Sequence, residues 1–393
     1  MSLIKKMWII LMFFGLFACN NTKEKSIIVT NSLPFARKSE TVEVSKKMLG
    51  ISSDSLFNSY GIVDAKTGNT VVYQLYDKNG DGKDDVILFQ PVVPADGQAT
   101  YIAKVLLPRP HFVSKVYSRF VPERTDDYAW ENDRVAFRTF GPTAERMVEQ
   151  HIPGGTLTSG IDCWMKKVNY LIINKWYKND LSKKESYHID HGEGFDNYHV
   201  GASSGCGGLG IWKDDTLWTS RNFSSWKRLA NGPLRTAFVL KYKDWRAGET
   251  VVSEKQLVTL DAGSNLTRFE VEITHTPIIT VGITLHEAKG KITGNPEKGW
   301  FSYMEKNPEH HYAIWTAIWA NPEDVLNYKK YISGVPDHSH LLVNLRVKNH
   351  KVVYYSGFSW TKSGQFNGKK GWEAYLTKFA EEQQHPLSIK MTH

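Results

Sequence analysis

Residues 266–285 read LTRFEVEITHTPIITVGITL and contain two successive strand-like runs. Within residues 267–273, charged residues alternate with apolar ones, so that Phe269, Val271 and Ile273 share one face of an extended chain. This alternation is typical of an antiparallel strand with one buried and one solvated face. The second run, residues 278–285, follows directly after Pro277. The stretch therefore predicts two neighbouring strands of an antiparallel sheet.

Similar runs recur on both sides of this stretch. Each is short, rich in β-branched or aromatic residues, and bounded by Gly, Asn, Asp or Pro. They comprise residues 26–30, 41–44, 71–76, 86–90, 99–107, 134–140, 234–242, 251–260, 313–319, 341–347 and 351–358. Helical periodicity is confined to residues 372–384, before Pro386, and to a shorter piece over 169–177. We therefore predict a mainly β fold, a large antiparallel, supersandwich-like β-sandwich with a few short helices and a C-terminal helix.

The N-terminus is typical of an exported lipoprotein. Lys5 and Lys6 precede an apolar run over residues 7–17, and Cys19 closes a lipobox-like sequence. The apolar run is too short to span a membrane as a helix. We predict a signal peptide over 1–18, lipidation at Cys19, a tether over 19–25 and a single β-sandwich domain over 26–393. Such a protein would be held at the outer membrane by its lipid alone and would face the periplasm.

The charge of the chain favours an acidic partner. Its formal net charge is +8, which falls to +6 when Lys5 and Lys6 leave with the signal peptide. The sequence lacks a basic helix or a dense Lys/Arg block, which argues against nucleic acid. An anionic polysaccharide fits better. The two remaining cysteines, Cys163 and Cys206, could pair but are too few for a disulfide framework.

The stretch YHIDHGEGFDNYHVGASSGCGGLGIW, residues 187–212, concentrates unusual chemistry in a run with seven glycines. It predicts a glycine-rich loop that presents His188, His191 and Tyr198 for acid–base chemistry, with Asp190 or Asp196 orienting a histidine. Two other interpretations remain open. One is a metal site formed by His188, Asp190 and His199, and the other is a polar loop without chemistry. The GxGxxG match over residues 205–210 is not followed by a helix, which excludes a nucleotide-binding motif.

Residues 77–85, DKNGDGKDD, resemble the first part of a calcium-binding loop. Leu88 stands where that loop would need its glutamate, and strands instead of helices flank the segment. A tight acidic hairpin is the alternative. If calcium binds, we expect a structural role with ligands from Asp77, Asn79, Asp81 and Asp85. No other cofactor is expected.

Two stretches place arginine in or next to predicted strands. RVAFRTFGP, residues 134–142, carries Arg134 and Arg138, and NGPLRT, residues 231–236, carries Arg235. Arginine binds carboxylates and sulfates through two parallel hydrogen bonds and keeps its charge. The three arginines are therefore candidates for binding an acidic ligand, with ion pairing inside the scaffold as the alternative.

Together these segments resemble a family of exported Bacteroidota proteins from polysaccharide-utilisation loci, which includes an ulvan oligosaccharide dehydratase. The resemblance rests on 134–142, 187–201 and 231–236, on the start Asn31-Ser32-Leu33 with Arg37 and Glu40, on 77–90, and on SGIDCW at 159–164.

The resemblance implies a carbon–oxygen lyase whose catalytic domain is the single domain over 26–393. This hydro-lyase would remove water from the non-reducing-end glucuronic or iduronic acid of sulfated ulvan-type oligosaccharides. The product would be a 4,5-unsaturated uronyl residue, which an unsaturated glycuronyl hydrolase removes.

The reaction needs a cation on the uronate, a base for the C5 proton and an acid for the departing hydroxyl. We assign His191 as the base and Tyr198 or His188 as the acid. Arg138 or Arg235 would hold the carboxylate, and Arg134 is a further candidate for carboxylate or sulfate. Two other functions remain, a non-catalytic glycan-binding lipoprotein and a metal-dependent polysaccharide lyase.

Overall fold

The structure is a computed structural model that describes residues 24–392. The predicted signal peptide, the predicted lipidation site Cys19 and most of the predicted tether lie outside this range. Each predicted run overlaps a strand, and the fold is mainly β with antiparallel pairing in its sheets. Within residues 24–392 the model contains no helix with the length and apolarity that a membrane span requires.

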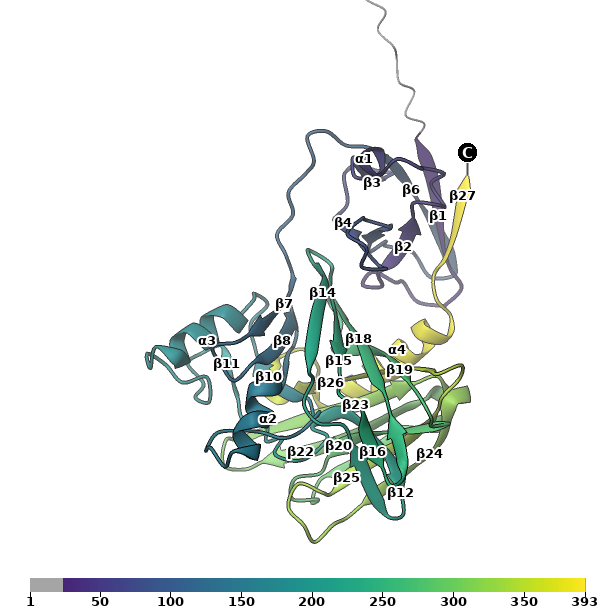
Figure 1. The fold of residues 1–393 in the computed structure, drawn as a ribbon. Helices are drawn as coiled ribbons and strands as arrows, with labels where there is room; N and C mark the ends of the chain where they lie inside the picture. The colour runs from purple at the N-terminus through teal and green to yellow at the C-terminus, as the bar shows by residue number, and fades with distance from the viewer. Residues whose placement is uncertain (1–23, 393) are drawn as a thin grey trace, which may run out of the picture.

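The first part of the chain forms a small β module of two sheets (Figure 1). One sheet has the order β27 (Ser388–Thr392), β1 (Lys25–Asn31), β6 (Gly97–Val105) and β3 (Tyr60–Asp64). The other has the order β2 (Val42–Ser45), β5 (Val86–Phe89) and β4 (Tyr73–Tyr76), and the short helix α1 (Asp54–Phe57) precedes β3. Alternating residues such as Ile27, Val29, Val42 and Val44 fill the core between the sheets.

The remaining chain builds a larger β body around a second core. Its eight-stranded sheet has the order β14 (Ser225–Asn231), β15 (Arg235–Lys241), β18 (Glu254–Asp261), β19 (Leu266–Ile273), β26 (Lys351–Trp360), β23 (Tyr312–Ala320), β22 (Trp300–Asn307) and β21 (Lys291–Asn295). The predicted alternation in β19 is confirmed, because Phe269, Val271 and Ile273 are buried while Glu270 and Glu272 are half-buried.

Two five-stranded sheets and one two-stranded ribbon complete this body. One sheet has the order β11 (Gly194–Asp196), β10 (Asp162–Lys166), β9 (Ala136–Thr139), β8 (Asp127–Asn132) and β7 (Val116–Val121). The other has the order β13 (Thr216–Thr219), β12 (Cys206–Lys213), β20 (Ile278–Thr284), β25 (His340–Arg346) and β24 (Val325–Tyr331). The ribbon pairs β16 (Trp245–Ala247) with β17 (Thr250–Val252). Apolar side chains from all three large sheets meet in one core.

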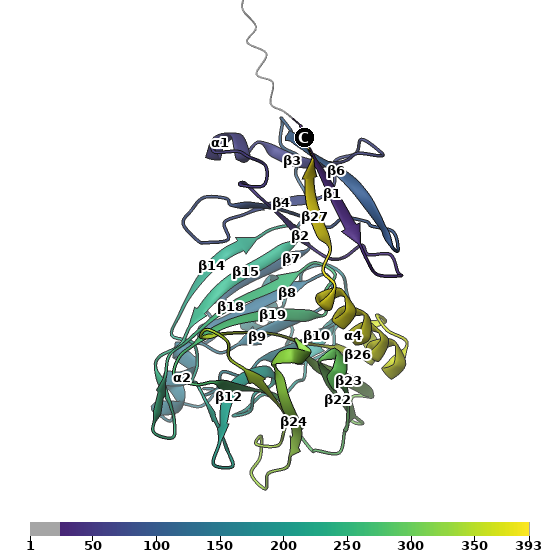
Figure 2. The same ribbon diagram turned by 90° about the vertical axis from the view of Figure 1, so that its right-hand side faces the viewer.

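Strand β23 is buried on both faces. Ile314 and Ile318 point into the core, while Trp315 and Trp319 point to the other face, where helix α4 (Gly368–Gln384) covers them. Figure 2 shows α4 lying along this face before the chain returns to the N-terminal module. Helix α4 confirms the predicted C-terminal helix and begins four residues earlier than expected.

The other helices are short and connect strands. Helix α2 (Pro142–Glu149) follows β9, and α3 (Ile173–Leu181) follows β10. Helix α3 begins and ends four residues later than the helix predicted over 169–177. Three 3₁₀ turns are η1 (Pro296–Lys298), η2 (Pro322–Asp324) and η3 (Thr361–Ser363). The expectation of one domain over 26–393 stays a prediction.

The stretch predicted as a glycine-rich loop, residues 187–212, contains strand β11 and most of strand β12. Glycine is required in β12 because a Cβ at Gly207 would overlap with Ser356, and one at Gly208 would press on the carbonyl of Ser204. The glycines of β12 therefore serve close packing between strands. Only the first half of the stretch behaves as the predicted loop.

Candidate active site

The turn before β11 is closed by a carboxylate. Asp190 accepts hydrogen bonds from the backbone N–H groups of Gly192 and Gly194, at 2.9 and 3.1 Å, and pairs with Lys167 at 2.8 Å. Gly194 has a φ of +109°, and a Cβ there would overlap with the carbonyl oxygen of Met165. Asp190 thus shapes the loop, and no hydrogen bond or ion pair joins it to a histidine among the described residues.

A cavity of about 720 Å³ opens beside this loop. Its volume is in the range of sites that bind small molecules. Strands β9, β10 and β11 contribute one side chain each, and the β7–β8 turn contributes Arg124. The chain between β9 and β10 adds Phe140, Val148 and residues 155–157, while His188 comes from the loop before β11 and residues 197–202 follow that strand. We call it the His–Arg pocket, and its polar lining consists of Arg124, Arg138, Thr156, Asp162, His188, Asp196, Asn197, Tyr198 and His199.

Arg138 lies at the buried side of the pocket and is 5 % exposed. Because Asp162 is its direct partner across the β9–β10 pair, the guanidinium meets that carboxylate at 2.5 and 2.9 Å. It also donates to Asp196 at 2.9 Å and to the Tyr187 hydroxyl at 3.2 Å. Arg138 is thus ion-paired in the scaffold, the alternative noted from the sequence.

Three carboxyl groups surround this guanidinium, since Asp127 lies 3.7 Å from it on the far side. Burial raises the pKa of Asp127 to about 6, against the opposing effect of Arg138. Burial also raises the pKa of Asp196, and the neighbouring charge of Asp162 raises it further. The cluster therefore holds protons at a higher pH than exposed carboxyl groups would.

His188 lies on the rim of the pocket, and its side chain is 57 % exposed. Its Nδ1 is 2.9 Å from the backbone carbonyl oxygen of Asp196 and 3.7 Å from the carboxylate of the same residue. A carbonyl oxygen can only accept a hydrogen bond, so Nδ1 carries the proton. In the neutral ring this leaves Nε2 with a free lone pair, the arrangement that a general base needs.

His199 lies on the same rim, with a side chain that is 67 % exposed. Its Nε2 is 3.1 Å from the carboxylate of Asp337, which comes from the loop between β24 and β25. The pocket thus holds two histidines, each with an oxygen acceptor on one ring nitrogen. Such pairing fixes the ring and the tautomer and leaves the second nitrogen for a ligand.

A buried imidazole supports this wall from behind. His286 lies 2.9 Å from the carboxylate of Glu305 through Nδ1, and 2.7 Å from the backbone carbonyl oxygen of His199 through Nε2. Burial disfavours its charge, but the hydrogen bond to Glu305 more than compensates and raises the pKa of His286. Both ring nitrogens face acceptors, so the protonated ring satisfies both contacts.

Tyr198 contributes its ring to the pocket but not an accessible hydroxyl. The hydroxyl is buried and has no hydrogen-bond partner among the described residues. Burial raises the pKa of Tyr198 well above its usual value. The ring packs edge-on against His286 at 4.9 Å between centroids. These contacts place the phenol among the core side chains.

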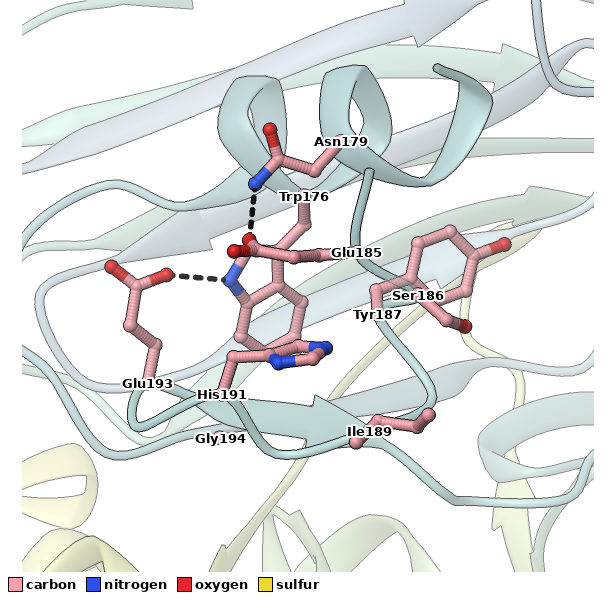
Figure 3. A pocket seen from close by; sticks show the side chains of 9 residues that line it. All are labelled: Trp176, Asn179, Glu185, Ser186, Tyr187, Ile189, His191, Glu193 and Gly194. Carbon is pink, nitrogen blue, oxygen red and sulfur yellow. Dashed lines mark hydrogen bonds between the residues drawn. The ribbon is translucent and has the colours of Figure 1, made fainter. Parts of the chain in front are cut away.

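His191 lies apart from the His–Arg pocket. It lines a separate hollow of about 20 Å³ together with Trp176, Ile189 and Glu193 (Figure 3). The Trp176 indole donates to Glu193 at 3.0 Å, and Glu193 pairs with Lys175 at 2.7 Å. A hollow of this size accommodates about one water molecule. The structure therefore does not bring His191 and His188 to the same cavity.

Neither Arg134 nor Arg235 lines the pocket. Arg134 donates to the amide oxygen of Asn265 at 2.5 Å. Arg235 forms two hydrogen bonds with Asp261, at 2.6 and 2.8 Å, and one with Glu43 at 2.5 Å. The contact between Arg235 and Glu43 joins β15 to strand β2 of the N-terminal module. Both arginines are therefore occupied within the scaffold.

Arg124 is the pocket residue that sequence reasoning missed. It is half-buried, lines the pocket and donates to Thr125 at 2.7 Å. None of the described carboxylates forms a direct ion pair with it, but burial is outweighed by the nearby charge of Asp127 and by Tyr187, so that the pKa of Arg124 is raised. Thr125 and Asp126 have positive φ angles, which mark the tight turn that holds Arg124 at the pocket. A second missed residue is Asp337, which is distant in sequence and gives no local signal.

The acidic hairpin over residues 77–85 directs its oxygens to its own backbone. Asp77 accepts from Gly80 and Gly82 at 2.7 Å each, and Asp85 accepts from Lys78 and Asn79 at 3.0 and 3.1 Å. Asn79 and Asp81 likewise accept from the backbone N–H groups of Asp81 and Lys83.

No group of three or more His, Cys, Asp or Glu residues in the described part of the chain could hold a metal ion. His188, Asp190 and His199, the metal ligands considered from the sequence, therefore do not form such a group. Structural calcium at the hairpin stays a prediction. Cys163 and Cys206 are both free and buried.

Comparison with known proteins gives one close match over nearly the full length. An uncharacterized protein, P7, of Formosa agariphila is 42 % identical over 381 residues, which is 96 % of each chain. An α-mannosidase structure from Enterococcus faecalis V583 aligns with a TM-score of 0.48 at 10 % identity. That alignment covers 94 % of this chain and 46 % of the mannosidase, so this chain spans about half of its length.

A structure of a glycosyl hydrolase family 38 protein from Enterococcus faecalis also aligns with a TM-score of 0.48, at 10 % identity over 94 % of this chain and 47 % of that one. A family model matches residues 29–389. The chain belongs to the family described as a domain of unknown function, DUF4861.

Proposed function

We propose that the protein is an oligosaccharide dehydratase, a hydro-lyase acting on the non-reducing-end uronic acid of sulfated ulvan-type oligosaccharides. The observation that carries the proposal is the His–Arg pocket, which combines two oriented histidines with a guanidinium that forms no direct ion pair. These are the three functions that the elimination requires. The sequence resemblance to ulvan oligosaccharide dehydratases supports the same reaction.

In the proposed mechanism Arg124 binds the uronate carboxylate. Its charge stabilises the enolate-like density that develops when the C5 proton leaves. Arg138 lies behind it, but its charge and hydrogen bonds are taken up by Asp162 and Asp196. Arg124 thus takes the carboxylate-binding role that the sequence suggested for Arg138 or Arg235, because Arg138 and Arg235 use their N–H groups in ion pairs of the scaffold.

His188 is the proposed base. Its Nδ1–H is held by Asp196, so Nε2 takes the C5 proton while the C5–H electron pair forms the C4=C5 double bond. The C4–O bond breaks, and protonated His199 donates a proton to the departing hydroxyl, which leaves as water. Asp337 orients His199. His191 and Tyr198 have no proton-transfer role in this scheme, because one lies in another hollow and the other has a buried hydroxyl.

We also propose that the protein works in the periplasm, anchored through lipidated Cys19. An anchored enzyme there would meet imported oligosaccharides, and an unsaturated glycuronyl hydrolase would consume its product.

The test is incubation with saturated uronyl–rhamnose sulfate oligomers of defined length. The dehydratase should lower product mass by one water and generate the ultraviolet band of an unsaturated uronate, with the chain length unchanged. Shorter products would identify a polysaccharide lyase instead, and loss of activity with EDTA would identify a metal-centred mechanism. Binding without any change in mass would identify a glycan-binding protein.

Paired variants test the assignment of the base. His188→Gln should lower kcat by at least about 10²-fold, the usual contribution of a general base. His191→Gln is the matched control on the same loop and should retain nearly full turnover, since it lines a hollow too small for sugar. The opposite pattern would refute the assignment of His188.

A further inference from the structure

A second concave site lies on the outer face of the eight-stranded sheet. It is a groove of about 430 Å³ that crosses β14, β15, β18 and β19, with the hairpin over residues 77–82 as one wall. Figure 1 shows the β14–β15 hairpin reaching toward the N-terminal module at this position. The groove shares no lining residue with the His–Arg pocket. We call it the lysine groove, after Lys78, Lys227, Lys241 and Lys255.

The register of the sheet explains why these side chains converge. Lys241 of β15 lies directly opposite Lys255 of β18, and Ser225 of β14 lies opposite Lys241. The neighbouring row runs from Lys227 through Val239 to Leu257. Residues between these positions, such as Phe238 and Val258, point into the core. All the groove residues named here therefore face outward.

The pairing of Lys241 with Lys255 is unfavourable for stability. Like charges directly opposite each other on neighbouring strands destabilise a sheet. Lys255 is relieved by Glu272 at 2.6 Å. Lys241 has no carboxylate within ion-pair distance among the described residues, and it is exposed. A charge that weakens the sheet and has no partner is well placed to bind an external anion.

We propose that the lysine groove binds a chain of an acidic polysaccharide, separately from any catalytic turnover. Lys241 offers a contact for a sulfate or carboxylate group without a competing partner. The other three lysines are bonded to Glu43, to the Gly80 carbonyl and to Glu272, and they add positive charge around it, while Val239 and Leu257 form an apolar floor. Glu270 and Glu272 line the other end and can accept hydrogen bonds from sugar hydroxyls. This mixture suits a polymer in which acidic groups alternate with hydroxyl-rich surfaces.

Nucleic acid fits the groove less well. A continuous phosphate backbone would meet the two glutamates at one end. Stacking of bases needs aromatic faces, and the ring of Trp226 is already stacked on Phe120, at 5.2 Å between centroids. The groove therefore favours a saccharide over a polynucleotide.

The experiment is affinity electrophoresis of the full mature chain in gels that contain chondroitin sulfate, dextran or oligo-dT. Chondroitin sulfate should retard the protein, and dextran should not. Lys241→Glu should weaken the binding by about fivefold or more. Lys370→Glu, the same charge change at an exposed lysine of α4, should leave it within about twofold of the wild type.

Three results would overturn the proposal. The first is that Lys241→Glu and Lys370→Glu lose affinity for chondroitin sulfate to the same extent. The second is that dextran retards the protein as much as chondroitin sulfate does, and the third is that oligo-dT binds as tightly as chondroitin sulfate. Turnover of short oligosaccharides should be unchanged in Lys241→Glu, because the residue lies outside the His–Arg pocket. A cooperative melting transition, at a temperature no lower than that of the wild type, confirms that both variants are folded.

Discussion

Replacing Arg138 with leucine should strongly destabilise the fold. The guanidinium is 5 % exposed, contacts Asp162 at 2.5 Å and Asp196 at 2.9 Å, and lies 3.7 Å from Asp127. Its removal leaves three buried carboxyl groups without their main counter-charge. Breaking a buried ion pair from one side costs about 3–5 kcal/mol, and we expect Arg138→Leu to fall in that range.

The assay is equilibrium unfolding in urea, with Arg134→Leu as the control. Arg134 hydrogen-bonds a neutral amide, so its replacement should cost only about 1–2 kcal/mol. The double variant Arg138→Leu/Asp162→Leu should be more stable than Arg138→Leu alone, because it removes one of the uncompensated carboxyl groups. A cost for Arg138→Leu no larger than that for Arg134→Leu would refute the reasoning.

The pH dependence of the same variant gives a second measurement. Burial already holds the pKa of Asp196 above its usual value, and the loss of the opposing guanidinium should raise this folded-state pKa further above that of the unfolded chain. A carboxyl group with a raised folded pKa contributes stability at low pH that is lost as the pH rises. The stability gap between Arg138→Leu and the wild type should therefore narrow as the solution is acidified. A gap that is constant with pH would argue against this electrostatic origin.

Three further predictions concern other parts of the molecule. The raised pKa of His286 implies that its contact with Glu305 stabilises the fold fully below about pH 6.5 and is lost as the pH rises through the folded-state pKa. The melting temperatures of wild type and Glu305→Gln should accordingly converge at alkaline pH, and parallel curves would contradict this. Gly194→Ala should prevent stable pairing of β11 because its Cβ overlaps with Met165, whereas Gly192→Ala, also at positive φ but with open space around it, should cost only about 1–2 kcal/mol by urea unfolding. Equal effects of the two would refute the overlap argument. Cys163 and Cys206 should resist a thiol reagent in the native protein and both react after denaturation, and rapid native labelling would show that these thiols are not buried as described.

Local patterns in the sequence predicted much of the fold. The alternation in β19 and the periodicity of α4 are visible without any tertiary information, because each reflects which face of one element is buried. Strand β12 was not predicted, since its glycines suggest a loop until the contact with Ser356 is known. The edge strand β14 was also missed, because five of its seven residues are exposed and carry no alternation.

The site was predictable only in part. The 187–201 segment, which the sequence singles out, supplies His188, Asp196, Tyr198 and His199 to the lining of the His–Arg pocket, and their roles stay a prediction. The partners of these residues could not be read from the sequence. Asp162 meets Arg138 through strand register, and Asp337 meets His199 from a loop 138 residues away. Such pairings follow from topology, which local chemistry does not encode.

The pairing of β27 with β1 has a consequence for how the protein matures. Ile27 faces Met391 across this pair, so the first sheet of the molecule gains its fourth strand from a segment that follows the whole larger β body in the sequence. A nascent or truncated chain that stops before Ser388 leaves β1 with an unpaired edge and exposes part of the module core around Leu387. The first sheet of the N-terminal module therefore cannot form completely until the larger β body between β6 and β27 has been synthesised.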